Sequence, residues 1–318
     1  MEHTRNLKVL KNQQALRLVE LRTELARKFV EHLPSAGEKR TAIPGFSLHR
    51  RSAPVSCNPT TYEPSLALFI QGRKRVNMGG TTYLCDESTF LLTSVDVPVV
   101  SQIFATEETP YLALRLALEM PLVREIISRE DLPEPAASCQ TRGIAVGKTT
   151  AELLSAFSRL MDLLDTPDDI PFLSNTIQRE IVYRLLRGPQ GERLRAIATS
   201  GDQSYRTAKA IALLRSNFDK PLRVEELAQV ARMGTSTFHH YFRALTAMSP
   251  LQYQKRLRLH AARDRMLVHG LDAASAAFEV GYESASQFNR EYKRFFGQPP
   301  VRDIRARRTS NIVAVSVA

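Results

Sequence analysis

The sequence predicts an α+β protein with a β-rich N-terminal half and an all-helical C-terminal domain. From about residue 41 to residue 118, short runs of β-branched and aromatic residues alternate with Gly, Asp and Pro, a pattern typical of strands and turns. From residue 150 onward, apolar residues recur at the helical period. A chain of 318 residues is long enough for two domains, each with its own hydrophobic core.

The charge of the chain is concentrated in its C-terminal third. Hydrophobic residues make up 43% and charged residues 24% of the sequence, as in ordinary soluble domains. Of the net charge of +11, residues 221–310 carry +7 (15 Lys/Arg less 8 Asp/Glu), and the first 220 residues carry +4 (29 less 25). This asymmetry favours a polyanionic partner, either nucleic acid or a membrane surface.

The sequence contains no pattern for membrane insertion or secretion. No apolar run approaches the roughly 18 residues of a membrane span. The charged N-terminus, MEHTRNLKVLKNQQ, lacks the apolar segment of a signal peptide. Three widely separated cysteines, Cys57, Cys85 and Cys139, fit reduced thiols better than a disulfide framework. We therefore expect a cytoplasmic protein with no membrane partner.

The N-terminal half is predicted to be a helical arm followed by a sheet domain. Residues 1–40 form the arm, because residues 12–33 have helical apolar spacing. Residues 41–196 form a β-sandwich or small β-barrel with flanking helices. Its predicted strands lie in SLALFIQG, KRVNMGG, TTYLC, FLLTSVDVPVVSQIF and PYLALRLAL. The glycines of NMGG (77–80) predict a hairpin turn.

Two amphipathic helices are predicted after the strands, at about 150–165 and 170–188. In the second helix, Phe172 and Leu173 are expected to share the buried face of Ile177. The two helices either cap the barrel or form a dimer seam, and packing within the chain is favoured. Small polar residues at 197–205 then predict a linker to the next domain.

Residues 206–308 are predicted to form a helical domain, followed by a tail at 309–318 without regular structure. A first helix-turn-helix unit, at about 222–245, comprises VEELAQVA, the turn RMG and TSTFHHYFRAL. One stripe of its second helix is apolar: Phe238, Tyr241, Phe242 and Leu245. The opposite stripe is a row of hydrogen-bonding groups: Ser236, His239, His240 and Arg243. Such a row, on a helix that follows a tight turn, suits the major groove of DNA.

A second unit, at about 272–296, repeats this pattern fifty residues later. Its apolar stripe contains Phe288, Tyr292 and Phe295. Its outward row contains Ser286, Asn289, Arg290 and Lys293. Gly281 permits the turn, and Tyr282 is expected to pack beneath it. Ser284 and Gln287 predict a capping box at the start of the helix.

These motifs carry a family resemblance. The segment from roughly Arg206 to Arg308 resembles the AraC/XylS-type DNA-binding domain, whose hallmark is a pair of helix-turn-helix units; VGYESASQFNREYKRFFGQPP resembles its second-unit signature and TAMSPLQYQKRLRL its linker helix. TAIPGFSLHRRSAP, YEPSLALFIQGRKRV and PYLALRLAL resemble the cupin-like sensor domain of one AraC subgroup. The resemblance covers the chain from about Thr41. It implies a regulator whose N-terminal domain binds a small-molecule effector and contributes to dimerisation.

Twelve residues of the two units are predicted to face DNA. They are Thr235, Ser236, Thr237, His239, His240, Arg243, Ser284, Ser286, Gln287, Asn289, Arg290 and Lys293. The basic members suit phosphate or guanine, and Asn289 suits a base edge such as that of adenine. Three departures from the family pattern fall in the first unit: Arg232 stands where Gly is usual, Gly234 where a Ser cap is common, and His240 where Arg is frequent. We therefore expect the first unit to bind less strongly than the second, or with different preference.

The predicted barrel gives no pattern for a metal centre or an active site. His49 is its only histidine, whereas metal cupins use clustered histidines with a carboxylate. We interpret His49 as a surface residue and expect no catalytic residue, metal or cofactor. P-loop and Ser-His-Asp patterns are absent from the sequence.

Three residues of the sensor domain are candidates for effector contacts: Tyr83, Cys85 and Arg115. Arg115 shares a strand face with Tyr111 and Ala113, so it either binds an anionic effector or faces water, and water is favoured. Cys85 could sense oxidants if its thiolate were stabilised, but an inert buried thiol is the favoured interpretation.

Together these observations predict a sequence-specific transcriptional regulator under effector control, and not an enzyme. Two recognition helices would enter successive major-groove turns, about 34 Å apart. The expected partners are double-stranded operator DNA, a small-molecule effector, RNA polymerase and a second copy of the chain. The alternatives are a cupin-type enzyme fused to a DNA-binding domain and a nucleoid-type DNA binder of low specificity.

Overall fold

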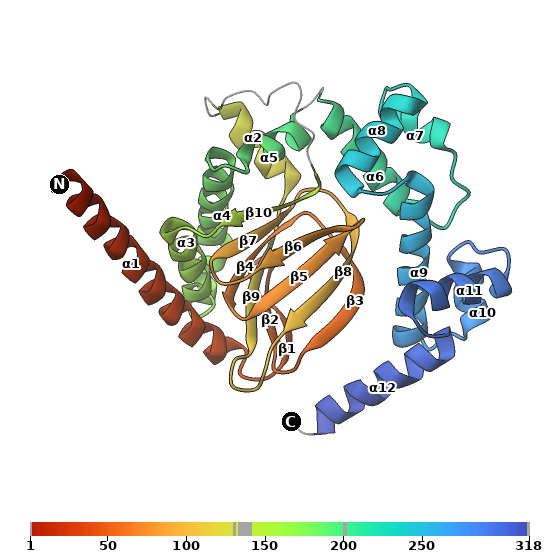
Figure 1. Ribbon diagram of the computed structural model, residues 1–318, viewed down its shortest axis with the longest axis horizontal. Coiled ribbons are helices and arrows are strands. Elements are labelled where there is room, and N and C mark those ends of the chain that lie inside the picture. The colour runs from red at the N-terminus through yellow and green to blue at the C-terminus, as the bar shows by residue number, and fades with distance from the viewer. Residues whose placement is uncertain (1, 130–131, 133–141, 200–201, 317–318) are drawn as a thin grey trace.

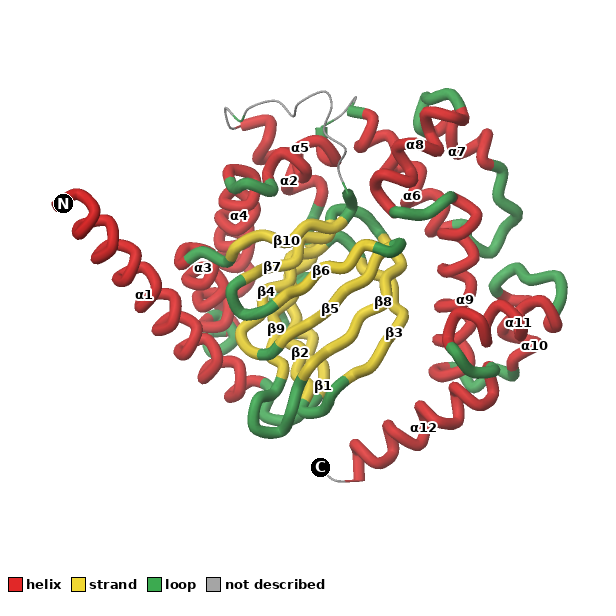
Figure 2. Tube along the Cα trace, in the orientation of Figure 1, coloured by secondary structure: helices red, strands yellow, loops and turns green. Residues whose placement is uncertain are grey.

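The computed structural model describes residues 2–129, 132, 142–199 and 202–316. A long N-terminal helix is followed by a β-sandwich with flanking helices, and a helical domain lies on the opposite side of the sandwich (Figure 1). Figure 2 shows that the strands occupy the centre of the molecule, with helices on both sides.

Strands occur only in the N-terminal half of the described chain. They are β1 (Gly37–Arg40), β2 (Phe46–Arg51), β3 (Val55–Tyr62), β4 (Ser65–Gln71), β5 (Arg73–Met78), β6 (Thr81–Cys85), β7 (Thr89–Thr93), β8 (Val97–Phe104), β9 (Tyr111–Ala117) and β10 (Ile144–Lys148). The flanking helices are α1 (Glu2–His32), α2 (Met120–Arg129), α3 (Ala151–Asp162), α4 (Ile170–Arg187) and α5 (Gly191–Ala198). The C-terminal helices are α6 (Gln203–Ser216), α7 (Val224–Val230), α8 (Thr235–Thr246), α9 (Pro250–Val268), α10 (Ala273–Glu279), α11 (Ala285–Phe296) and α12 (Pro300–Ser316). Helix α12 extends into the segment for which no regular structure was predicted.

The strands form two antiparallel sheets whose inner faces share one core. The larger sheet has the order β1-β2-β9-β4-β7-β10, and the smaller has the order β3-β8-β5-β6. Neither sheet closes on itself, so the domain is a two-sheet sandwich rather than a closed barrel. The predicted β-rich domain with flanking helices is confirmed.

Strand β9 shows how the alternation of side chains divides the apolar residues into two layers. Leu112, Leu114 and Leu116 are at most 2% exposed and belong to the core formed with α1, α3 and α4. Tyr111 and Ala113 point to the other face, into the space between the sheets. The helices therefore cover the outer face of the larger sheet, and its inner face is left to the sandwich interior.

The NMGG hairpin forms as predicted. Met78 of β5 pairs with Thr81 of β6, and the two residues between them, Gly79 and Gly80, have φ of 56° and 91°. Two positive φ values define a type I′ turn, whose twist matches that of the flanking strands.

Helices α3 and α4 pack against the larger sheet, so packing within the chain, which was favoured over a dimer seam, is what the structure shows. One part of the prediction is wrong: Phe172 is 79% exposed and Leu173 is 39% exposed. The buried stripe of α4 instead runs through Ile170, Ser174, Ile177, Ile181 and Leu185. At 100° per residue, position 172 lies opposite this stripe and position 173 lies at its edge.

The C-terminal domain divides into two helical units joined by α9. Helices α6, α7 and α8 pack on the first half of α9, and their core is continuous with the sandwich interior. Helices α10, α11 and α12 pack on its second half and form a separate core. Helix α9 begins with Pro250 after a complete capping box between Ser249 and Gln252.

The two units differ by one residue in their turns. After α7 the left-handed position is Arg232, with φ of 52°, and after α10 it is Gly281, with φ of 86°. This offset is forty-nine residues, whereas the recognition helices are offset by fifty. The first unit thus holds an arginine in the left-handed region, at a conformational cost that the glycine of the second unit avoids.

We expect the second unit to lose stability in acid through His260 of α9. The ring is 7% exposed and makes edge contacts with Phe295 (5.4 Å) and Phe296 (5.8 Å). Burial, with nearby Arg263 and Arg256, lowers its pKa from 6.5 to about 3. The unfolded chain therefore binds the extra proton first, and stability falls by up to about 1.4 kcal/mol per pH unit between these two values.

This pH dependence is measured by urea unfolding of full-length protein at a series of pH values. His260→Leu should reduce the slope of the curve between pH 6.5 and about 3, whereas the control His269→Leu, at an exposed position, should leave it unchanged. An unaltered acid slope in the His260 variant would show that other groups cause the loss.

Candidate nucleic-acid interface and effector cavity

The first predicted recognition helix, α8, presents its polar residues to solvent. The exposed residues are Thr235, Ser236, Thr237, His240 and Arg243. His239 is half-buried, as is Tyr241 on the other side of the helix. Phe238, Phe242 and Leu245 are at most 1% exposed and hold the helix in place. The predicted division between an apolar and a polar stripe is confirmed for this helix, except that Tyr241 and His239 lie at its borders.

The second predicted recognition helix, α11, has the same division. Its exposed predicted residues are Ser286, Gln287, Asn289, Arg290 and Lys293. Phe288 and Tyr292 are fully buried, and Tyr282 packs edge-on against Phe288 at 5.3 Å between ring centres. Arg294, which the sequence analysis did not select, is also exposed one turn after Arg290. The outer face of α11 thus carries more positive charge than predicted.

The two helices begin differently. Ser284 accepts a hydrogen bond from the backbone N–H of Gln287 (3.3 Å), and it is half-buried because it serves as the cap. The predicted capping box is incomplete, since the Gln287 side chain does not accept from the backbone N–H of Ser284, and its Nε2 instead donates to Glu291 (3.4 Å). Gly234 provides no side-chain cap for α8. The first recognition helix therefore has the weaker start.

The C-terminal end of α8 lies against the sensor domain. The backbone N–H of Gly143 donates to the carbonyl of Leu245 (2.8 Å). A Cβ added at Gly79 would lie 2.4 Å from the Cβ of Ala247. Arg243 lines a small cleft together with Thr81 and Arg142 of the sensor domain. A movement of the β5–β6 hairpin would therefore change its contacts with the C-terminal end of α8.

A cavity of about 330 Å³ lies between the two sheets of the sandwich. Its polar lining includes His49, Asn58, Glu63, Lys74 and Arg115. Its apolar and aromatic lining includes Tyr62, Leu91, Ile103, Tyr111 and Ala113. The volume lies at the small end of the range of roughly 300–1,000 Å³ that is typical of small-molecule sites.

The cavity changes the interpretation of two sequence-predicted residues. His49 is not a surface residue: it is half-buried, lines the cavity and hydrogen-bonds with Ser47 Oγ (3.0 Å). Burial, with the charges of Lys74 and Arg51, lowers its pKa to about 3, so the ring is neutral. Arg115 also lines the cavity instead of facing open water. The surface interpretation failed for both because β2 and β9 turn these positions toward the second sheet.

The other two effector candidates lie away from the lining of this cavity. Burial raises the pKa of the Cys85 thiol to about 12, so it remains protonated at neutral pH. This agrees with the favoured interpretation of an inert thiol. Tyr83 is partly buried against the sandwich core. The side chain of Cys57 and all of Cys139 lie outside the described residues.

Lys74 is the cavity residue that the sequence analysis missed. Its Nζ lies 5.0 Å from the ring centre of Tyr62 and 5.9 Å from that of Tyr111. Burial opposes the charge of the Lys74 amine, and the two tyrosine rings that face it attract that charge. Lys74 lies between Arg73 and Arg75, so the sequence does not show which of these charged residues faces the cavity. Only the register of β5 in the sheet places Lys74 there.

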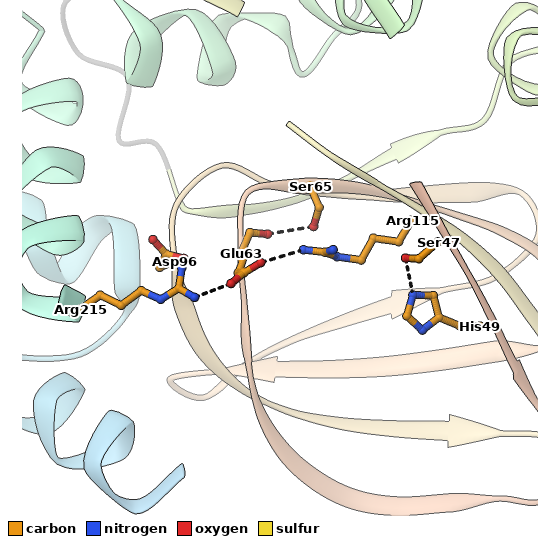
Figure 3. A network of polar contacts seen from close by, with 7 residues as sticks. All are labelled: Ser47, His49, Glu63, Ser65, Asp96, Arg115 and Arg215. Carbon is orange, nitrogen blue, oxygen red and sulfur yellow. Dashed lines mark hydrogen bonds and ion pairs between the residues drawn. The ribbon is translucent and has the colours of Figure 1, made fainter. Parts of the chain in front are cut away.

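A polar network connects the cavity to the helical domain (Figure 3). Glu63 pairs with Arg115 (3.5 Å) in the cavity and with Arg215 of α6. Arg215 also pairs with Asp96, whose carbonyl accepts a hydrogen bond from Tyr253 of α9 (2.8 Å). The hydrogen bond from Arg215 holds the pKa of Glu63 below its usual range.

Two features of the described residues bear on the alternatives. His, Cys, Asp and Glu side chains nowhere gather there in a group of three that could hold a metal ion. None of the described helices is both long and apolar enough to cross a bilayer.

A β-sandwich joined to paired helix-turn-helix units defines a two-domain helix-turn-helix protein, and comparisons with known proteins agree. The family model of the AraC-type transcriptional regulator N-terminus matches residues 42–193, and the family model of a helix-turn-helix domain matches residues 227–306. The transcriptional regulator ArgR of Pseudomonas aeruginosa is 26% identical over 137 residues, which are 43% of this chain and 42% of ArgR. The chain thus matches less than half the length of this relative. The chain belongs to the AraC/XylS family.

Solved structures share the fold. Apo ToxT from Vibrio cholerae, in a variant form, has a TM-score of 0.55 at 12% identity, over 83% of this chain and 98% of that one. Wild-type ToxT from the same organism, bound to an unsaturated fatty acid, has a TM-score of 0.54 at 10% identity, over 84% and 97% of the two chains.

Proposed function

We propose that the protein is a sequence-specific DNA-binding transcriptional regulator controlled by a small-molecule effector. The observation that carries this proposal is the pair of exposed polar faces on α8 and α11, each held by a buried aromatic stripe. Both helices follow a tight turn and lie in a basic domain. This is the arrangement by which helix-turn-helix proteins enter the major groove.

The cavity between the sheets is the proposed effector site. The likeness to ToxT, which has been solved with an unsaturated fatty acid bound, supports a small-molecule ligand for a protein of this fold. The network from Arg115 through Glu63 to Arg215 gives that ligand a physical connection to the helical domain. A cytoplasmic regulator of this kind would act as a homodimer, would contact RNA polymerase and would have no catalytic activity.

Selection of binding sites from random duplex DNA by the full-length protein tests this function. We expect enrichment of one sequence whose length corresponds to two successive major-groove turns. Binding to it should survive competition by excess bulk DNA. Failure to enrich any sequence, with binding that modest salt abolishes, would instead indicate the low-specificity DNA binder.

We expect Arg290→Ala to weaken binding to the selected site by about 1–3 kcal/mol and to relax specificity at one base pair. Arg290 is exposed at the outer face of α11, where a guanidinium can reach guanine or phosphate. Titrations against the selected site and single-base variants would measure both effects. Arg27→Ala, which removes an exposed arginine of α1 on the sensor side, is the matched control for net charge.

The two contact types of Arg290 give different outcomes. A guanine contact predicts a loss confined to the selected site, whereas a phosphate contact predicts an equal loss on all sequences with a shallower salt dependence. Arg290→Ala binding with unchanged affinity and unchanged salt dependence would remove Arg290 from the interface.

A further inference from the structure

Lys74 points into the cavity from a core-facing position. Val76 and Met78, two and four residues further along β5, are fully buried, so Lys74 occupies the inward register of the same strand. Its amine interacts with the rings of Tyr62 and Tyr111, and none of the ion pairs among the described residues joins it to a carboxylate. A cation held between two sheets without a counter-ion destabilises the folded state. A bound anion would offset that cost.

Two other polar groups of the cavity can take a further hydrogen-bond partner. Asn58 Oδ1 is buried and has no hydrogen-bond partner among the described residues. As an amide oxygen it can only accept, so it selects a hydrogen-bond donor. Arg115 holds Glu63 through one contact of 3.5 Å, which leaves its other donors available to the cavity. The remaining wall is apolar and aromatic: Tyr62, Leu91, Ile103, Tyr111 and Ala113.

We propose that this cavity binds a small organic acid that carries a hydrogen-bond donor, with its carboxylate on Lys74 and Arg115 and its donor on Asn58. This inference rests on the proposed function and deepens it by naming the chemical class of the effector. The volume of about 330 Å³ restricts the acid to a single ring or a short chain. The tyrosines and aliphatic residues of the wall suit a flat or apolar body.

Occupancy of the cavity would reach the DNA-binding domain through Glu63. A carboxylate that pairs with Arg115 competes with Glu63 for the same guanidinium. This competition changes the ion pair between Glu63 and Arg215 (Figure 3). Arg215 belongs to α6, whose core is shared with the first recognition helix. Because coupling between two ligands is reciprocal, the acid must change DNA affinity by the factor by which DNA changes acid affinity.

Calorimetry on the full-length protein tests the ligand class without DNA. The probes are 4-hydroxybenzoate, salicylate, mandelate and lactate, each paired with its neutral primary amide. We expect at least one acid to bind about tenfold to a hundredfold more tightly than its amide, as a charge-assisted contact would give. Lys74→Met should abolish this preference, whereas Lys148→Met, which removes an exposed lysine of β10, should preserve it.

A ligand-free measurement separates a binding lysine from a structural one. Replacing an unpaired inward cation by Met should leave the Tm of the unliganded protein unchanged or raise it. A lower Tm for Lys74→Met, equal binding of acids and amides, or equal acid affinity in Lys74→Met and wild type would each overturn the proposal. Because no DNA is present, these results are independent of the site-selection experiment.

The route through Glu63 has its own test. The probe is the acid that binds most tightly, titrated in the presence and absence of the selected DNA site. Arg215→Gln should retain acid affinity, since Arg215 does not line the cavity, but should lose the effect of the acid on DNA affinity. An undiminished effect in Arg215→Gln would refute this route.

Discussion

Replacing Phe288 by Ala is expected to destabilise the second helix-turn-helix unit by about 3–5 kcal/mol. The ring is fully buried and makes edge contacts with Tyr282 (5.3 Å) and Tyr292 (5.4 Å). Its removal leaves a cavity in the core formed by α9, α10, α11 and α12. Because this core is separate from that of the first unit, the loss should appear as early melting of one part of the chain.

Hydrogen exchange resolved by segment, together with thermal unfolding, would measure this effect. Phe278→Ala is the matched control, because Phe278 belongs to the same unit but is 57% exposed, and it should cost no more than about 0.5 kcal/mol. Uniform destabilisation of both units by Phe288→Ala would contradict the division into two cores.

Gly281→Ala is expected to cost about 2–5 kcal/mol and to misplace the start of α11. Two effects add at this position. Its φ of 86° costs an alanine about 1–2 kcal/mol. Its new Cβ would also lie 1.9 Å from the carbonyl oxygen of Asp219, which forces a backbone shift worth roughly 1–3 kcal/mol.

Gly297→Ala separates these two effects. Gly297 has nearly the same φ, 83°, but a Cβ there meets no atom within 4 Å. Urea unfolding should therefore show only the conformational cost for Gly297→Ala and a clearly larger loss for Gly281→Ala. Equal losses would mean that Asp219 moves aside without cost. We further expect Gly281→Ala to weaken DNA binding more than Gly297→Ala does, since Gly281 lies in the turn that leads into α11, whereas Gly297 is the C-cap at its end.

The helical domain could be predicted because its signals are local. The apolar stripe of each recognition helix, the capping serine at 284 and the glycine at 281 all act within a few residues of one another. Each can therefore be recognised in a short stretch of sequence. The repeat of one stripe in the other, at Phe238 and Phe288, then identifies the pair.

The effector cavity could not be predicted in the same way. His49, Lys74 and Arg115 come from β2, β5 and β9, which meet only when two sheets pack face to face. Periodicity in a single strand does not say which face is inward when charged residues occupy both faces. His49 was therefore interpreted as a surface residue, water was favoured over an effector contact for Arg115, and Lys74 was not selected.

The measurement that tests the central claim most directly is a hydroxyl-radical footprint of the full-length protein on its selected DNA site. If α8 and α11 both act as recognition helices, two protected patches should lie on one face of the duplex, about one helical turn or 34 Å apart. Arg290→Ala should weaken one patch and leave the other. Protection of a single patch, or diffuse protection that bulk DNA removes, would contradict recognition by paired helices.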